Sequence, residues 1–126
     1  MFFNEAIKQS LLPFMESKGF RLIEDYKSGV KFSSSRTLFS PAYLEVRFSY
    51  DYSFSKEFSF HICYVTKTET IKCLEDHEII DKLKFRTGSY EKLSEDDQIK
   101  KAIQYYQDLF LEKSDILLDK KAFLNL

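Results

Sequence analysis

Several features that mark common classes of protein are missing from this sequence. It has no Trp, two Pro and three Gly. The glycines stand far apart, at positions 19, 29 and 88, so no glycine-rich loop of the kind that cradles phosphates is present. Gly and Pro are too rare for a low-complexity or disordered chain. No apolar run approaches the roughly 20 residues that a membrane-spanning helix needs.

The sequence also lacks an excess of charge of either sign. Its 19 basic and 20 acidic residues give a net charge of −1. Generic nucleic-acid binders carry a surplus of Lys and Arg, because these side chains contact phosphates. We therefore expect no nucleic-acid partner.

The first residues, Met1 to Glu5, contain neither a basic region nor a long apolar stretch, so no signal peptide is predicted. We therefore expect a cytoplasmic protein with no membrane partner, in which the two cysteines, Cys63 and Cys73, are reduced. A disulfide between them would require secretion by another route.

Apolar and aromatic residues are abundant. Hydrophobic residues make up 44% of the chain, and aromatic residues, all Phe or Tyr, make up 17%. A length of 126 residues fits a single domain, residues 1–126, and these aromatic residues can supply its core.

The first predicted element is a helix over residues 4–18 with Asn4 as its N-cap, because apolar residues recur at helical spacing. Pro13 lies inside this pattern and predicts a kink or an early break near Leu12. Gly19 then supplies a left-handed end to the helix.

Strands are predicted to follow. Residues 20–27 and 30–33 form a first hairpin, with Lys27-Ser28-Gly29 as a three-residue loop. The clearest pattern covers residues 43–50 and 57–64, where apolar residues occupy the even-numbered positions. This alternation is typical of half-buried strands.

The two apolar sets can share one face of a sheet only if the loop between these strands has an odd number of residues. We expect three or five, around Tyr52 to Lys56. Arg47 then lies opposite His61 or Ser59, depending on that loop.

Helices are predicted for the C-terminal part. Residues 74–85 have a short helix-like pattern, and a stronger helix follows the cap Ser94, with Asp97 at the capping-box position. Ser114 and Asp115 are predicted to cap a last helix. The fold class is therefore α+β, with an N-terminal helix, an antiparallel sheet of about four strands and C-terminal helices packed on one face.

Four residues of zinc-binding type, His61, Cys63, Cys73 and His77, occur within 17 positions. Their spacing matches no familiar zinc pattern, and no motif marks either cysteine as a nucleophile. Surface histidines and free thiols are the simpler interpretation. We predict no catalytic residue, no metal and no cofactor.

Two groups of residues suggest a surface for a protein partner. Glu75-Asp76-His77-Glu78 is the densest acidic cluster, although a solvated helix start would also explain it. Tyr43, Arg47, Tyr52 and Phe54 surround one hairpin and are of the types that protein contact centres favour. Phe54 could instead fold under and cap the core. The predicted partner-binding residues are Tyr43, Arg47, Tyr52, Phe54, Glu75, Asp76 and Glu78.

A second hypothesis is a small enzyme or small-ligand-binding protein. Its pocket would lie between the sheet and the helices, with Glu45, Arg47 and His61 as the polar lining. The same strand face, together with Cys63, could also be a solvated surface. The missing catalytic motifs favour a protein that is not an enzyme.

The segment Ile7-Lys8-Gln9-Ser10-Leu11-Leu12-Pro13-Phe14-Met15-Glu16-Ser17-Lys18-Gly19-Phe20 is an amphipathic helix that ends in Gly-Phe and enters a strand. With the later strand Leu44-Glu45-Val46-Arg47-Phe48, it resembles small bacterial single-domain proteins of unknown function, some of which are immunity proteins for polymorphic toxins. The resemblance covers about half of the chain. It implies a protein-binding module with no cofactor and an acidic or aromatic surface. If this chain is one of the immunity proteins, its partner is a toxin that it neutralises by occluding the active site.

Overall fold

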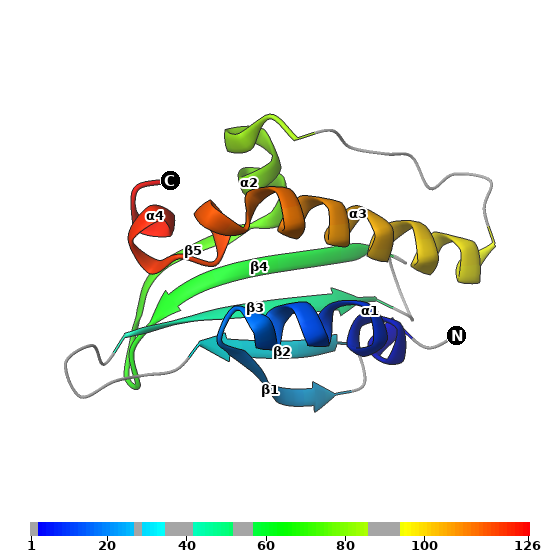
Figure 1. Ribbon diagram of the computed structural model, residues 1–126, viewed down its shortest axis with the longest axis horizontal. Coiled ribbons are helices and arrows are strands. Elements are labelled where there is room, and N and C mark those ends of the chain that lie inside the picture. Colours follow the sequence, from blue (N-terminus) through cyan, green and yellow to red (C-terminus); the bar gives the residue numbers. More distant parts are fainter. Residues whose placement is uncertain (1–2, 27–28, 35–41, 52–56, 86–93) are drawn as a thin grey trace.

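The structure is a computed structural model that describes residues 3–26, 29–34, 42–51, 57–85 and 94–126. Along the chain, one helix is followed by five strands and then by three helices. Figure 1 shows the sheet with helices from both ends of the chain lying along it. The predicted α+β class is confirmed: an N-terminal helix is followed along the chain by an antiparallel sheet and then by C-terminal helices.

Helix α1 (Phe3–Ser17) buries a stripe of apolar residues at intervals of three and four positions. The sequence predicted a kink or an early break near Leu12; Pro13 lies inside α1 and the helix continues to Ser17, so the early break is wrong. Pro13 is exposed, so water can solvate the carbonyl that its missing N–H would have bonded. The helix ends as predicted at Gly19, which has a φ of 84°.

One antiparallel sheet contains all five strands in sequence order, β1-β2-β3-β4-β5. The sequence predicted about four. The additional strand is β5, which includes Leu74, a residue that the sequence assigned to a helix. The strands are β1 (Phe20–Tyr26), β2 (Gly29–Ser34), β3 (Tyr43–Tyr50), β4 (Phe58–Val65) and β5 (Thr70–Glu75).

In the central hairpin, the even-numbered residues of β3 pair with even-numbered residues of β4, as predicted. Arg47 lies opposite His61, which is one of the two predicted alternatives. The backbone N–H of Asp51 donates to the carbonyl of Glu57 at 3.0 Å, and five positions separate these two residues in the sequence. This number is odd, as predicted, and the apolar residues of both strands therefore share one face.

The first hairpin differs from the prediction. Gly29 pairs with Tyr26 and is therefore the first residue of strand β2, whereas the prediction placed it in the loop. The register also shifts between Leu22 and Glu24, a β-bulge at Ile23 that the alternating sequence did not indicate.

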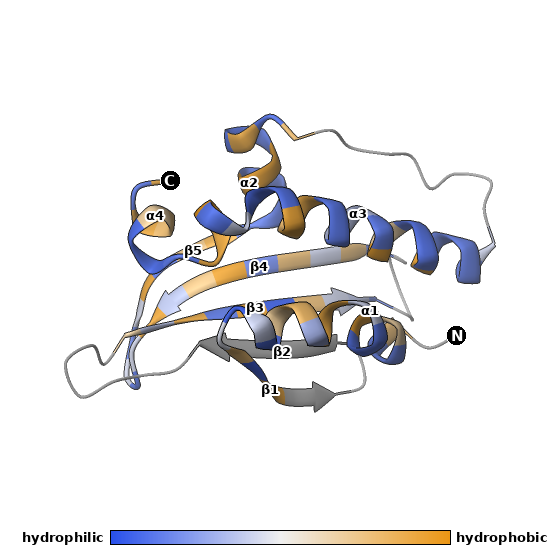
Figure 2. Ribbon diagram, in the orientation of Figure 1, coloured by the Kyte–Doolittle hydropathy of each residue, from blue (hydrophilic) through white to orange (hydrophobic). Residues whose placement is uncertain are grey.

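Aromatic rings fill the space between the sheet and helix α3 (Glu95–Leu117). The ring of Phe48 lies 5.2 Å from that of Tyr106 and 5.3 Å from that of Phe110. The ring of Phe60 lies 5.4 Å from each of the same two rings. In Figure 2, hydrophobic bands interrupt an otherwise hydrophilic α3, as expected of a helix that buries one side.

The caps of the C-terminal helices are partly as predicted. Ser94 caps α3, because its hydroxyl accepts from the N–H of Asp97 at 3.2 Å. The backbone leaves helical geometry at Lys113, next to the predicted cap Ser114, but α3 resumes and ends at Leu117. The last helix, α4 (Lys120–Leu124), is capped instead by Asp119, whose carboxylate accepts from the N–H of Ala122 at 2.9 Å.

Helix α2 (Asp76–Leu83) follows β5 directly and buries Ile79 in the core. Lys72 of β5 holds the end of the chain, since its Nζ donates to the carbonyls of Leu124 and Leu126 at 3.2 Å. Among the described residues, none of the helices has both the length and the apolar character to cross a bilayer.

Candidate functional site

The sheet has two chemically different sides. Side chains alternate along a strand, and the even-numbered residues of β3 and β4 point toward α1 and α3. The odd-numbered residues lie on the opposite side, which we call the outer sheet face. Within β3, β4 and β5, this face comprises Tyr43, Glu45, Arg47 and Ser49 of β3, Ser59, His61, Cys63 and Val65 of β4, and Cys73 and Glu75 of β5. It continues across β2 and β1, where Lys31 is opposite Arg47.

The register brings ionisable residues of β3, β4 and β5 into one row across this face. His61 of β4 pairs with Arg47 on one side and with Glu75 on the other. Arg47 belongs to the predicted aromatic and basic contact region, and Glu75 to the predicted acidic cluster. The structure therefore unites two regions that the sequence kept apart, with His61 between them.

His61 is half-buried at the centre of the row. Its pKa is lowered from the ordinary value, first because burial disfavours the charged imidazolium and then because the Arg47 guanidinium lies close. The carboxylates of Glu75, Glu45 and Asp76 act in the opposite direction without reversing the shift. The imidazole is consequently neutral at neutral pH and can both donate and accept a hydrogen bond.

The acidic residues at the junction of β5 and α2 are held by backbone hydrogen bonds. The Glu78 carboxylate accepts from the N–H of Glu75 at 3.1 Å, and the Glu75 side chain accepts in return from the N–H of Glu78. The Asp76 carboxylate accepts from the N–H of Phe60 at 3.3 Å and from that of His77 at 2.7 Å. We call Glu75, Asp76 and Glu78 the junction carboxylates.

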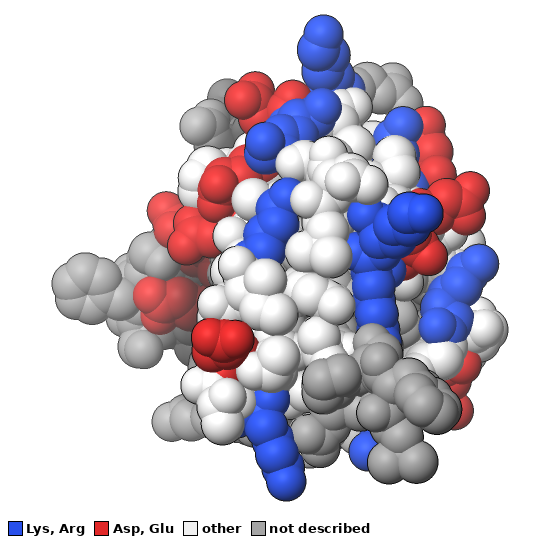
Figure 3. Space-filling model, turned by 90° about the vertical axis from the view of Figure 1, so that its left-hand side faces the viewer, with Lys and Arg blue, Asp and Glu red and all other residues white. Residues whose placement is uncertain are grey.

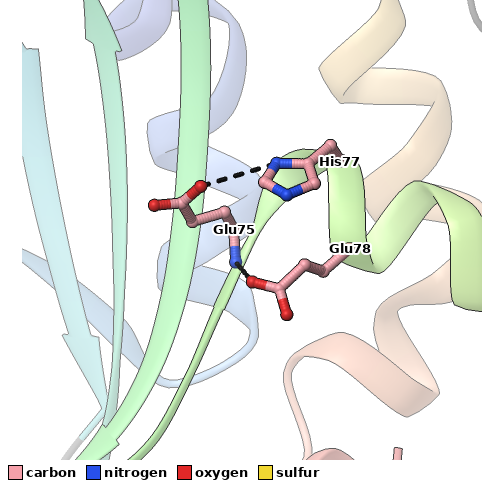
Figure 4. Close-up of side chains that lie close together, drawn as sticks. All are labelled: Glu75, His77 and Glu78. Atoms are coloured by element: carbon pink, nitrogen blue, oxygen red, sulfur yellow. Dashed lines mark hydrogen bonds and ion pairs between the residues drawn. The ribbon is translucent and has the colours of Figure 1, made fainter.

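Glu75, His77 and Glu78 also bring potential metal ligands within 4.8 Å of one another (Figure 4). Nδ1 of His77 lies 3.5 Å from a carboxylate oxygen of Glu75, and the two side chains are 72% and 68% exposed. The capping box accounts for the positions of both glutamates. Beside this cluster is an open depression of ≈ 590 Å³, lined by Asp76, His77, Glu78, Ile80 and Asp81.

The cysteines differ from the prediction that both are reduced. Cys63 and Cys73 are directly opposed on β4 and β5, and the structure joins them in a disulfide. The sequence did not identify β5 as a strand, so it gave no indication that Cys73 lies next to Cys63. Cys63 is buried, whereas Cys73 is exposed on the edge strand.

The predicted partner-binding residues fall into three groups. Tyr43 and Arg47 lie half-buried on the outer sheet face. The junction carboxylates lie at one end of the same face, and Asp76 is near enough to influence His61. Tyr52 and Phe54 lie outside the described residues, and the prediction that Phe54 could cap the core concerns one of these residues.

The alternative pocket is not where the sequence hypothesis placed it. Glu45, Arg47 and His61 lie on the outer sheet face, on the far side of the sheet from α1 and α3. In the described part of the chain, fully buried rings such as those of Phe48 and Phe60 fill the space between sheet and helices.

Figure 3 shows the side of the molecule on which α4 lies, and basic and acidic side chains are interspersed there among uncharged ones. The described residues therefore form no broad field of one charge on this side. Comparisons with models of protein families, with curated proteins and with solved structures find no match to this chain. Its function must accordingly be inferred from its own surface.

Proposed function

We propose that this protein is a protein-binding module whose contact surface is the outer sheet face together with the junction carboxylates. One observation carries the proposal. The row Arg47–His61–Glu75 brings a basic and aromatic region and an acidic cluster onto one contiguous surface. Helices α1 and α3 pack on the sheet from its other side.

The residue types on this surface suit a protein contact. Tyr and Arg are enriched at the energetic centres of interfaces, because they bury a large area and also form directed polar contacts. Tyr43 and Arg47 are already half-buried, so little side-chain freedom remains to be lost on binding. The strands beneath them hold both side chains on a rigid base.

Charge indicates the kind of partner. At the β5 end of this surface, Glu75, Asp76 and Glu78 bring three carboxylates together, and Glu45 adds a fourth on β3, whereas the basic residues Arg47, Lys31 and Arg21 stand on β3, β2 and β1. A partner with a basic patch complements such a surface and gains in association rate. The resemblance to immunity proteins supports a toxin as the partner. A nuclease toxin would fit best, because the carboxylates could take the place of phosphates in its basic active-site cleft.

Affinity capture with the tagged full chain from lysate of its source cell, read by mass spectrometry, identifies the partner. The affinity of the purified pair is then measured for Arg47→Ala and Glu75→Lys. We expect each to weaken binding at least tenfold, which corresponds to about 1.4 kcal/mol. Glu112→Lys is the matched control, because Glu112 is exposed on α3, which packs on the other side of the sheet.

Affinity capture tests whether the chain binds a protein, and the variants test which surface makes the contact. A partner whose affinity is unchanged in Arg47→Ala and Glu75→Lys but reduced in Glu112→Lys would move the contact surface to α3. A folded chain that captures no stoichiometric partner would refute the protein-binding role.

A further inference from the structure

Four side chains of zinc-binding type occupy two adjacent cross-strand pairs on the outer sheet face. His61 is opposite Glu75, and Cys63 is opposite Cys73. Residues two apart on a strand point to the same side, so His61 and Cys63 project together from β4, and Cys73 and Glu75 from β5. Four potential ligands thus stand at the corners of a small rectangle of the sheet.

The two sulfur atoms already converge. Cys63 and Cys73 are joined in a disulfide, and their Cα atoms are 4.1 Å apart. A tetrahedral zinc ion with Zn–S bonds of about 2.3 Å holds two sulfur atoms about 3.8 Å apart. Opposed residues of antiparallel strands have Cβ atoms about 4.5–5.5 Å apart, so rotation of the side chains is enough to reach this separation after reduction.

The neighbouring row supplies the other two ligands and their surroundings. His61 is half-buried, and Glu75 is exposed beside it. The carboxylates of Glu45 and Asp76 also lie near His61. A metal-binding histidine usually donates its second ring N–H to such a carboxylate. Arg47, on the other side of His61, offsets part of the negative charge of two thiolates and a carboxylate.

We propose that the reduced pair Cys63 and Cys73, together with His61 and Glu75, forms a zinc site, and that the disulfide is its oxidised, metal-free state. Two thiolates, one imidazole and one carboxylate are a donor set that suits Zn²⁺. The site goes beyond the proposed protein-binding role and does not depend on it.

The exchange between the two states balances. A cellular dithiol transfers two electrons and two protons to the disulfide, which gives two cysteine thiols and the oxidised disulfide of the reductant. Zn²⁺ then displaces one proton from each thiol. In the reverse direction, an oxidised disulfide takes two electrons from the two thiolates and two protons from the solvent, the Cys63–Cys73 bond forms and Zn²⁺ leaves. A reducing cytoplasm, which the sequence predicts for this chain, would favour the zinc form.

The cluster of Glu75, His77 and Glu78 is the competing location for a metal, and the two sites share Glu75. Variants of the residues that are not shared distinguish them. His77→Ala changes a histidine on α2 that is absent from the proposed site, and it is the matched control for His61→Ala on β4.

The test uses the full chain, with and without reduction by a phosphine, under exclusion of oxygen. Zn²⁺ affinity is measured by competition with a chromophoric chelator, stoichiometry by native mass spectrometry, and thiolate ligation by the charge-transfer absorption of Co²⁺. We expect one Zn²⁺ per reduced chain and none tightly bound to the oxidised chain. We also expect at least tenfold weaker binding in His61→Ala and Glu75→Gln, and less than twofold change in His77→Ala.

Circular dichroism establishes that each variant is folded. Cys63→Ser/Cys73→Ser should bind no Zn²⁺ tightly under reduction. If this variant does not fold, His61→Ala and the Co²⁺ spectrum of the reduced natural chain decide the question, because both keep the cysteines. Equal Zn²⁺ affinity in the oxidised and reduced chains would overturn the proposal. So would a reduced chain that holds no Zn²⁺, or binding lost in His77→Ala and kept in His61→Ala.

Discussion

Phe48 offers the most direct test of the fold. Its side chain is fully buried on the inner side of β3, against Tyr106 and Phe110 of α3 and against Phe60 of β4. Phe48→Ala removes the ring from this cluster and leaves a cavity, because the surrounding rings belong to different elements and cannot all close the gap.

Replacing a buried Phe by Ala costs about 3–5 kcal/mol of unfolding free energy. A domain has about 5–15 kcal/mol in total, so Phe48→Ala removes a large share. For a chain of this size, 1 kcal/mol lowers Tm by about 4 °C, which gives an expected fall of about 12–20 °C. The double variant with Phe110→Ala should reveal a coupling of about 0.5–1.5 kcal/mol from the edge-to-face pair.

Urea unfolding followed by far-UV circular dichroism measures these free energies. Leu111→Ala is the control, because Leu111 is 62% exposed on α3 and its loss should change stability by less than about 0.5 kcal/mol. Arg47→Ala tests the register of β3. If the strand were shifted by one residue, Arg47 would face the helices and Phe48 would lie on the outer sheet face. The reasoning fails if Phe48→Ala costs less than about 1 kcal/mol while Arg47→Ala costs more.

Three further outcomes follow from single residues. Gly19→Ala should cost about 1–2 kcal/mol through backbone strain alone, because Gly19 has a φ of +84° and a new Cβ would meet no heavy atom within 4 Å; Gly19→Asn, in the same urea assay, should recover part of the loss. Tyr50→Phe should cost about 1 kcal/mol without changing the denaturant slope, since it removes the hydroxyl that donates to the Glu95 carboxylate at 3.1 Å; a neutral result would mean that water replaces this bond. The pKa of His61 is lower in the folded chain than in the unfolded one, so the unfolded chain binds more protons as the pH falls below about 6.5, and stability decreases there. His61→Gln should lose less stability than the natural chain between pH 7.5 and 5.5, and an equal loss in both would exclude His61 as the cause.

Much of the fold followed from local patterns in the sequence. The alternation from Leu44 to Tyr50 and from Phe58 to Tyr64 fixed two strands, their buried side and the parity of their loop. Ser94 and Gly19 marked a helix start and a helix end through chemistry that acts within a few residues. Such features can be predicted because neither depends on a distant part of the chain.

Strand β5 could not be predicted in this way. It is an edge strand with exposed Ile71 and Cys73, so it lacks the alternation that marked β3 and β4. Leu74 is buried, and the sequence grouped it with Ile79, Ile80 and Leu83 in a short helix-like pattern. Long-range pairing with β4 determined the outcome.

The candidate site depended on this strand. Tyr43, Arg47 and the junction carboxylates were recognised by residue type, but their proximity follows from β5 pairing with β4. The opposition of Cys63 and Cys73 has the same origin, so neither the disulfide nor the proposed zinc site could be inferred from spacing along the chain.

The contact between α1 and α3 has a consequence for how the chain folds. Every strand neighbours the next along the chain, so the sheet can assemble from local hairpins. Helices α1 and α3, which cover it, lie far apart in the sequence, and the side-chain amide of Gln107 in α3 donates at 3.1 Å to the carbonyl of Ser10, 97 positions earlier. Closing so long a loop is the entropically costly step, and we expect it to limit the folding rate. During synthesis on the ribosome, the aromatic side of the β3–β4 hairpin therefore stays exposed until α3 emerges, and in that interval the nascent chain is most prone to aggregate.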